Sequence, residues 1–214
     1  MSDHFDQAYW DDRYGTGDDV WSGAPNPVLV SETLALPAGR ALDIGCGEGA
    51  DAIWLATRGW QVTAADFSGV ALDRAAARSR RAGADPAASA VIADRITWEQ
   101  HDFTRWVPPA GAFDLVSAQF MHLPSEQRTP LFRALATAVA ARGTLLIVGH
   151  DMSASHDPGH TPEADLFFTA ADVAATLDPG QWQVDVAESR PRTAKDPDGA
   201  VITLADAVLS ARRR

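Results

Sequence analysis

The chain has 214 residues, of which 46% are hydrophobic and 22% charged, and its formal net charge is −11. This length suits one domain that buries its own apolar core without a disulfide or metal. The negative charge argues against a nucleic-acid partner and against an anionic membrane surface. The single cysteine, Cys46, excludes an intrachain disulfide and any paired-cysteine motif.

Neither a signal peptide nor a membrane-spanning stretch is expected. The first ten residues lack a basic start and an apolar core, and no apolar run reaches about 18 residues. We therefore expect a cytoplasmic protein without a membrane partner.

Taken in order, the elements change character near residue 40. Residues 1–39 are rich in aromatics, Gly and Pro, with a break at 24–27 and a short helix expected near 28–34. From residue 40, short apolar strands alternate with helical patterns. Strands are expected at 41–44, 61–65, 96–101, 113–118, 144–149, 182–188 and 201–209. Helices are expected at 50–58, 68–81, 124–141 and 169–177, and loops at 83–90 and 150–165.

This alternation predicts an α/β fold in which helices cover both faces of a mostly parallel sheet. No helix separates the last two strands, which should therefore pair antiparallel at one edge. We divide the chain into an N-terminal extension, 1–39, and a ligand-binding domain, 40–214.

A glycine-rich turn follows the first strand of the sheet. Asp43 precedes Gly45, Gly47 and Gly49, which alternate with other residues before a helix begins. Glycines let the chain turn tightly and let a ligand approach the backbone. Ligands of open α/β sheets bind at the carboxyl ends of the strands, where this turn lies.

A second acid, Asp66, ends the next strand 23 residues after Asp43. A carboxylate at that place can accept hydrogen bonds from both hydroxyls of a ribose, and Phe67 beside it can pack on an adenine face. Glycine turns also occur without a ligand, but the joint pattern favours a nucleoside cofactor.

The turn lacks the Gly-x-Gly-x-x-Gly spacing of dinucleotide sites, and the chain has no Gly-Lys-Ser/Thr phosphate loop. An acid at position 43 would repel a pyrophosphate but suits an ammonium group. The pattern resembles motif I of the class I S-adenosylmethionine-dependent methyltransferases. This resemblance, over residues 40–209, implies a Rossmann-like, doubly wound, seven-stranded sheet with an antiparallel last strand, and S-adenosyl-L-methionine as cofactor.

The resemblance also assigns roles to residues. Asp43 and Gly45 would face the methionine end, Asp66 the ribose, and Asp102 and Phe103 the adenine, while residues 118–121 would run beside the sulfonium. The cofactor-binding positions expected in this domain are Asp43, Gly45, Cys46, Gly47, Asp66, Phe67, Ser68, Asp102, Phe103, Gln119 and Met121. Cys46 is expected to act as a small packing residue.

The N-terminal stretch, with Tyr9-Trp10-Asp11-Asp12-Arg13-Tyr14 and Val20-Trp21-Ser22-Gly23, resembles that of thiopurine- and tellurite-type methyltransferases. There this segment folds over the cofactor. Trp21 is the expected lid, Arg13 a partner for the cofactor carboxylate, and Trp10 a further contact. The alternative is that Trp10 and Trp21 anchor the segment by burial.

His122 and His150 follow the fourth and fifth strands and are the expected catalytic residues, since histidine can act as a base near neutral pH. The alternative is that each is a polar loop residue. The loop from His150 to His160 matches no zinc spacing, so we expect no metal but a mobile acceptor-side lid.

In-line transfer of a methyl group to a small-molecule acceptor through S, O, N or a chalcogen is the favoured function. Methylation of nucleic acid or protein, and a non-catalytic nucleoside-binding domain, are the alternatives. The sequence leaves open whether the protein is a monomer or a homodimer.

Overall fold

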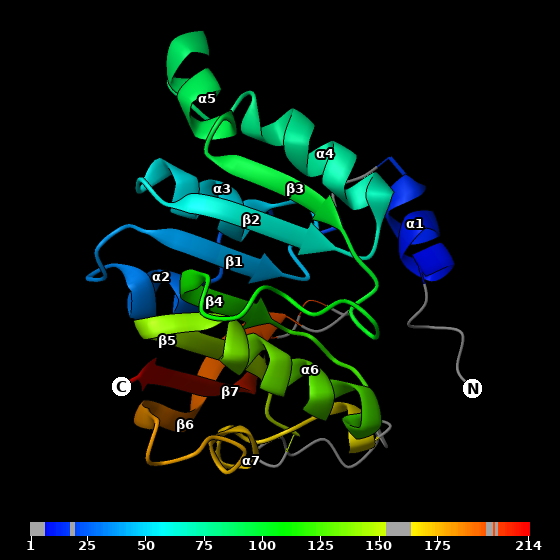
Figure 1. The fold of residues 1–214 in the computed structure, drawn as a ribbon. Helices are drawn as coiled ribbons and strands as arrows, with labels where there is room; N and C mark the ends of the chain where they lie inside the picture. Colours follow the sequence, from blue (N-terminus) through cyan, green and yellow to red (C-terminus); the bar gives the residue numbers. More distant parts are fainter. Residues whose placement is uncertain (1–6, 18–19, 153–163, 196–198, 200) are drawn as a thin grey trace.

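The computed structural model describes residues 7–17, 20–152, 164–195, 199 and 201–214. Its centre is one seven-stranded sheet with the strand order β3-β2-β1-β4-β5-β7-β6 (Figure 1). The strands are β1 Arg40–Ile44, β2 Gln61–Asp66, β3 Ile96–Gln100, β4 Phe113–Gln119, β5 Val139–His150, β6 Trp182–Lys195 and β7 Val201–Arg213.

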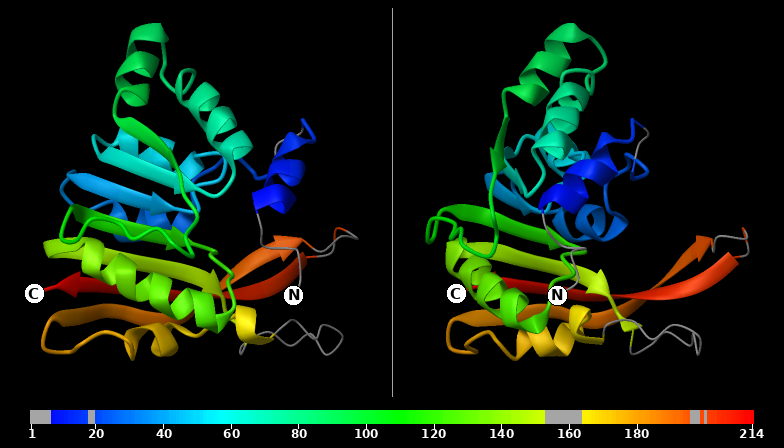
Figure 2. Two further views of the ribbon diagram at one scale, coloured as in Figure 1. Left: turned by 45° about the vertical axis from the view of Figure 1, so that its right-hand side comes forward. Right: turned by 90° about the vertical axis from the view of Figure 1, so that its right-hand side faces the viewer.

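The first five strands are parallel, and β7 inserts antiparallel between β5 and β6. The predicted fold class, including the antiparallel last strand, is therefore confirmed. β6 and β7 are longer than predicted. Figure 2 shows their far end curving away from the sheet as an arm.

Helices cover both faces of the sheet. One apolar cluster joins β1, β2 and β4 to α2 (Pro27–Thr33), α3 (Ala50–Thr57) and α5 (Pro86–Ala93). A second cluster joins the opposite face of the sheet to α6 (Ser125–Ala138) and α7 (Ala170–Ala174). Because both faces are covered, most residues of the central strands are buried, and Leu42, Ile44 and Leu115 are fully buried.

Two helices were not predicted. α5 lies over much of the stretch expected to be a loop at 83–90. Asp85 is its N-cap and accepts a hydrogen bond from Ala88 N at 2.8 Å, so Pro86 begins a helix and does not interrupt one. α1 (Gln7–Gly15) lies in the aromatic N-terminal stretch and packs on α4 (Gly69–Ser79).

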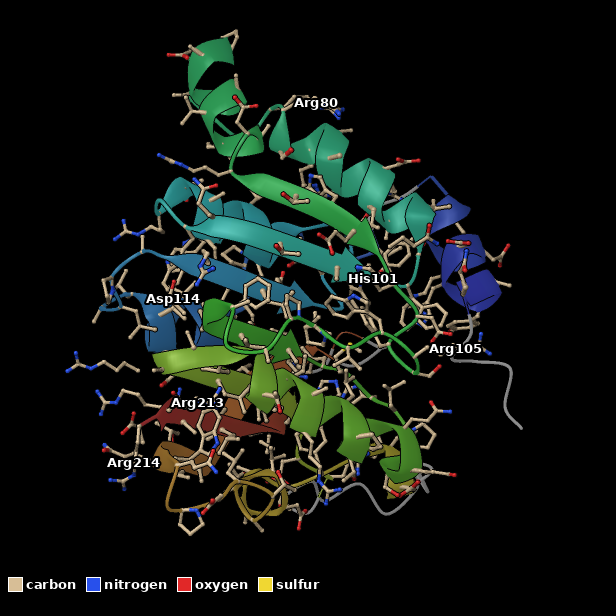
Figure 3. The ribbon with its side chains drawn as sticks, in the orientation of Figure 1. Arg80, His101, Arg105, Asp114, Arg213 and Arg214 are labelled. Atoms are coloured by element: carbon tan, nitrogen blue, oxygen red, sulfur yellow. The ribbon has the colours of Figure 1, made fainter. Side chains whose placement is uncertain are left out.

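The carboxyl ends of the parallel strands form the edge that matters for function. β1 ends at Ile44, β2 at Asp66, β4 at Gln119 and β5 at His150. α1 lies beyond the ends of β1, β2 and β3 (Figure 1). Figure 3 shows His101 and Arg105 on this side and Asp114 and Arg213 on the opposite side. No helix among the described residues is both long and apolar enough to cross a bilayer.

Candidate functional site

The glycine turn after β1 has the backbone shape that its sequence predicts. Gly45, Gly47 and Gly49 all have positive φ, at +69°, +51° and +79°. The N–H groups of Gly45 and Cys46 both donate to the carbonyl of Ala65, at 2.9 and 3.1 Å, which ties the turn to β2. Gly49 then forms the N-cap of α3.

Other side chains press directly against this turn. A Cβ on Gly45 would overlap the sulfur of Met121, and a Cβ on Gly47 would lie 2.9 Å from the hydroxyl oxygen of Tyr14. Met121 and the N-terminal segment therefore pack against the same turn, Met121 at Gly45 and Tyr14 at Gly47.

The carboxylate of Asp43 is buried beside the turn. Asp43 is 2% exposed, and its Oδ2 has no hydrogen-bond partner among the described residues. Burial, reinforced by the nearby carboxylates of Asp51 and Asp66, raises the pKa of Asp43 well above its usual value. A cationic group at Oδ2 would offset this cost.

Asp66 lies at the end of β2 with both carboxylate oxygens fixed. Its Oδ2 accepts from Gly47 N at 2.7 Å, and its Oδ1 accepts from Ser68 N at 2.9 Å. Burial raises the pKa of Asp66, and these hydrogen bonds oppose that shift. The acid thus connects the glycine turn to the start of α4.

Gln119, at the end of β4, carries a second buried acceptor. Its Nε2 donates to Ser117 Oγ at 2.8 Å, but its Oε1 has no partner among the described residues. Ser117 is the register partner of Asp43 across β1 and β4. Two unpartnered oxygens therefore belong to adjacent strands at the edge where ligands bind.

The predicted adenine positions lie after β2 and β3. Asp102 accepts from Thr104 N at 2.9 Å and Thr104 Oγ1 at 2.6 Å, and its side chain is 42% exposed. Phe103 is only 6% exposed and belongs to the apolar core. Its ring packs edge-on against Phe67, with the ring centres 6.2 Å apart. Phe67 is the less buried ring of the pair.

Cys46 and Ser68 have structural roles. Burial and the neighbouring Asp66 raise the pKa of the Cys46 thiol well above its usual value, which agrees with a packing role. Ser68 is the N-cap of α4, as predicted, and accepts from Ala71 N at 3.1 Å. Its hydroxyl donates to Asp11 Oδ1 at 2.5 Å, which ties α1 to α4.

The N-terminal segment is held by Glu48, a residue of the glycine turn that is 2% exposed. Its Oε2 accepts from the N–H groups of Val20 and Trp21, both at 3.2 Å. Its Oε1 forms a 2.9 Å ion pair with Arg74, which also donates to the carbonyl of Tyr14 at 2.6 Å. The segment is thus attached to the same turn that precedes α3.

The aromatic residues of this segment contact one another. The indole N–H of Trp21 donates to the Tyr14 hydroxyl at 2.9 Å, and Trp10 stacks on Tyr14 with ring centres 5.9 Å apart. The Arg13 guanidinium lies 5.8 Å from the centre of the Trp10 ring and 5.4 Å from that of Trp21. Trp21 is 49% exposed, so it is not a buried anchor.

The two predicted catalytic histidines lie together. The rings of His122 and His150 stack with centres 4.8 Å apart, and His150 N donates to His122 Nε2 at 3.3 Å. Burial, with the nearby His150 and Arg128, lowers the pKa of His122 to about 4. Phe120 packs on His150 and Phe167 on His122. We call these four residues the histidine rim.

Phe120 shapes the route from the glycine turn to the histidine rim. Its φ of +56° lies in the left-handed region that non-glycine residues rarely adopt. Its N–H still donates to the carbonyl of Val148 at 2.7 Å, after which the chain leaves β4. Met121, over Gly45, and His122, against His150, follow directly.

Other residues of the site were missed in the sequence. Asp206 Oδ1 lies 3.3 Å from His150 Nδ1, and Arg192 binds Asp206 at 2.9 Å. The one sequence signal for Asp206 was the presence of an acid within the alternating apolar pattern of residues 201–209. Among the described residues no cluster of ligands for a metal is present. Most of the His150–His160 loop lies outside the described residues.

The residues present fit S-adenosylmethionine. Asp43 Oδ2 and Gln119 Oε1 offer unpartnered acceptors for an ammonium group. Asp66 offers a fixed carboxylate for ribose hydroxyls, and Phe67 an incompletely buried ring near the adenine position.

Replacement of Asp43 by Asn tests whether its carboxylate is destabilising without a cation. The raised pKa means that the folded state holds the proton more tightly than the unfolded state, so Asp43 costs stability above about pH 4, the unfolded value. We expect Asp43→Asn to raise the free energy of unfolding at pH 7, measured in urea, with no gain below the unfolded pKa. The exposed Asp73→Asn is the matched control, and an equal or lower stability of Asp43→Asn at pH 7 would contradict the interpretation.

The comparisons with known proteins agree with this geometry. Residues 41–143 match a family model described as a methyltransferase domain. A probable thiol methyltransferase 2 of Arabidopsis thaliana is 33% identical over 110 residues, which cover 50% of this chain and 45% of that protein. The chain spans between 40% and 48% of the length of the curated relatives it matches.

Two solved structures share the fold. TehB from Haemophilus influenzae has a TM-score of 0.69 at 18% identity, over 97% of this chain and 67% of that one. An S-adenosylmethionine-dependent methyltransferase from Anabaena variabilis has a TM-score of 0.68 at 19% identity, over 97% and 93% of the two chains. Residues 41–143 are therefore similar to methyltransferase domains, and the whole chain shares its fold with an S-adenosylmethionine-dependent methyltransferase.

Proposed function

We propose that this protein transfers the methyl group of S-adenosylmethionine to a small-molecule acceptor bound at the histidine rim. The observation that carries the proposal is the pair of unpartnered buried oxygens on Asp43 and Gln119, beside a glycine turn that meets Met121. The thiol methyltransferase among the similar proteins, and the resemblance of the N-terminal stretch to thiopurine- and tellurite-type methyltransferases, favour a sulfur or other chalcogen acceptor.

Asp43 and Gln119 hold the amino group of the cofactor in this proposal, and Asp66 holds its ribose. Asp102 and Phe67 lie toward the adenine, while Phe103 supports Phe67 from the core. When bound, S-adenosylmethionine supplies a methyl group on a positively charged sulfur. This sulfur leaves readily as a neutral thioether. The protein contributes position and a site that excludes water.

The histidine rim receives the acceptor. A lone pair of the acceptor forms the new bond to the methyl carbon as the bond between that carbon and the cofactor sulfur breaks. A protic acceptor must also lose a proton, which a histidine can take. His122 is neutral at pH 7 because its pKa is about 4, and its Nε2 already accepts from the backbone of His150. His122 is therefore the lining residue of the pair, and His150 is the base.

In this proposal the part of the N-terminal segment around Tyr14 and Trp21 covers the cofactor. Tyr14 and Trp21 lie against Gly47, and Glu48 holds the backbone of residues 20 and 21. Trp21 is half-exposed and closes the site from the solvent side. The Arg13 guanidinium lies over the rings of both Trp10 and Trp21 and so links the two side chains.

An acceptor screen tests the proposed function. Incubation with S-adenosylmethionine and a panel of small thiols, selenite, tellurite, phenols and amines should produce S-adenosylhomocysteine with the thiol or chalcogen acceptors. Nucleic acid and a protein mixture serve as comparison acceptors, for which no product is expected. A protein that binds neither S-adenosylmethionine nor S-adenosylhomocysteine, or that methylates only a macromolecule, would overturn the proposal.

Asp66→Ala tests the ribose assignment. Loss of charged hydrogen bonds should weaken S-adenosylhomocysteine binding by about 1–3 kcal/mol, roughly 5- to 150-fold in Kd by calorimetry. Asp102→Ala is the matched control, and its effect should be smaller because its side chain is 42% exposed. Unchanged affinity in folded Asp66→Ala protein would refute the assignment.

Trp21→Ala separates a cover over the cofactor from an anchor of the fold. Because Trp21 is 49% exposed, its loss should leave the melting temperature of the free protein nearly unchanged and weaken cofactor binding. Trp21→Phe keeps a ring without the N–H that reaches Tyr14, and should bind more tightly than the alanine variant. A lowered melting temperature with normal affinity would instead indicate an anchor.

A further inference from the structure

The antiparallel end of the sheet places a carboxylate and a guanidinium at the histidine rim. His150 is the register partner of Asp206 across β5 and β7. Directly opposite residues of a strand pair point to the same face. On the other side of β7, Arg192 in β6 pairs with Leu204, two positions from Asp206. The two strands thus bring both side chains to His150.

The contacts form a chain from β6 to the histidine rim. Arg192 Nε donates to Asp206 at 2.9 Å, and Asp206 Oδ1 lies 3.3 Å from His150 Nδ1. Asp206 is 3% exposed, whereas the side chains of Arg192 and His150 are each 35% exposed. Arg192 also lies over the ring of Phe120 at 6.0 Å. A buried carboxylate therefore backs an imidazole that reaches solvent.

Two groups compete for His150 Nδ1. Asp206 Oδ1 can only accept a hydrogen bond when ionised, whereas Arg192 Nη2, also 3.3 Å away, can only donate one. If Nδ1 carries the proton, it donates to Asp206 and leaves the lone pair on Nε2. If Nδ1 accepts from Arg192, the proton lies on Nε2 and His150 cannot act as a base there.

The burial of Asp206 favours the arrangement in which His150 carries its proton on Nδ1. Burial acts to raise the pKa of Asp206, but the hydrogen bonds from His150 and Arg192 outweigh it and leave the pKa below its usual value. An ionised carboxylate that is almost fully buried needs every donor within reach. Arg192 already donates its Nε–H to Asp206, and its other N–H groups can donate to solvent. A hydrogen bond from His150 Nδ1 therefore stabilises Asp206 more than a hydrogen bond to Nδ1 would stabilise Arg192.

We propose that Asp206 is a positioning residue that accepts a hydrogen bond from His150 Nδ1, so that Nε2 can take the proton of a thiol acceptor. This proposal rests on the proposed methyltransferase function. The S–H bond breaks and its proton goes to Nε2. The sulfur electron pair forms the bond to the methyl carbon, and the bond from that carbon to the cofactor sulfur breaks. The resulting imidazolium is stabilised by Asp206 and returns its proton to solvent.

Arg192 acts through Asp206. Its ion pair fixes the carboxylate of Asp206, and its guanidinium over the Phe120 ring connects β6 to the residue that follows β4. A site for an acceptor that already lacks a proton, such as an oxyanion, would not need this arrangement. The chain from Arg192 to His150 therefore favours a protic acceptor.

Asp206→Asn tests the proposal, because the amide can donate to Nδ1 and so favours the opposite tautomer. Methylation rates of wild type and variant are compared at one pH for a series of thiols of graded acidity. For weakly acidic alkyl thiols the variant should be slower by about 100-fold, the contribution of a general base. For aromatic thiols that are already ionised, the two rates should become nearly equal, since no proton must be removed.

The controls separate positioning from a loss of structure. Arg190 lies in the same strand as Arg192, but its guanidinium binds Glu32 and Glu188 and not Asp206. The control variant Arg190→Gln should therefore leave the dependence of the rate on thiol acidity unchanged. Circular dichroism and S-adenosylhomocysteine binding verify that each variant is folded. An equal slowing of every thiol, or no slowing of any, would overturn the proposal.

Nitrogen NMR of the His150 ring gives a readout that needs no turnover. We expect the proton on Nδ1 in the wild type and on Nε2 in Asp206→Asn. A wild-type ring with its proton on Nε2 overturns the positioning role. A wild type that methylates no acceptor, while His150 carries its proton on Nδ1, would instead show that the proposed function has failed and that the positioning is correct.

Discussion

The site depends on the burial of one carboxylate, that of Asp43. Its side chain is almost fully enclosed, faces the carboxylates of Asp51 and Asp66, and keeps one oxygen without a partner among the described residues. Such an arrangement costs free energy in the absence of a cation. A cation bound at that oxygen would offset the cost.

The rest of the site is arranged around this carboxylate. Asp66 ties the glycine turn to α4, and Glu48 ties the same turn to the N-terminal segment. Gly45, on the other side, meets Met121, which leads to His122 and the histidine rim. The turn is therefore the common support of the proposed cofactor cover and the proposed acceptor site. A change in its backbone would disturb both.

Local patterns predicted the fold well. The short apolar strands, the glycine spacing and the N-cap at Ser68 are all encoded within a few neighbouring residues. Prediction failed where the decisive contact is distant in sequence. Asp206 meets His150 only through the pairing of β5 with β7, and Glu48 meets residues 20 and 21 only after the N-terminal segment folds back. α5 was missed because Pro86 was interpreted as part of a loop, although it follows an Asp N-cap.

Calorimetry of cofactor binding in buffers of different ionisation enthalpy tests the central claim most directly, because it counts the protons released. If burial keeps Asp43 protonated in the free protein and the ammonium group of S-adenosylhomocysteine ionises it, wild type should release more protons on binding near neutral pH than Asp43→Asn does. Equal proton release by the two proteins, with measurable binding by both, would contradict the account.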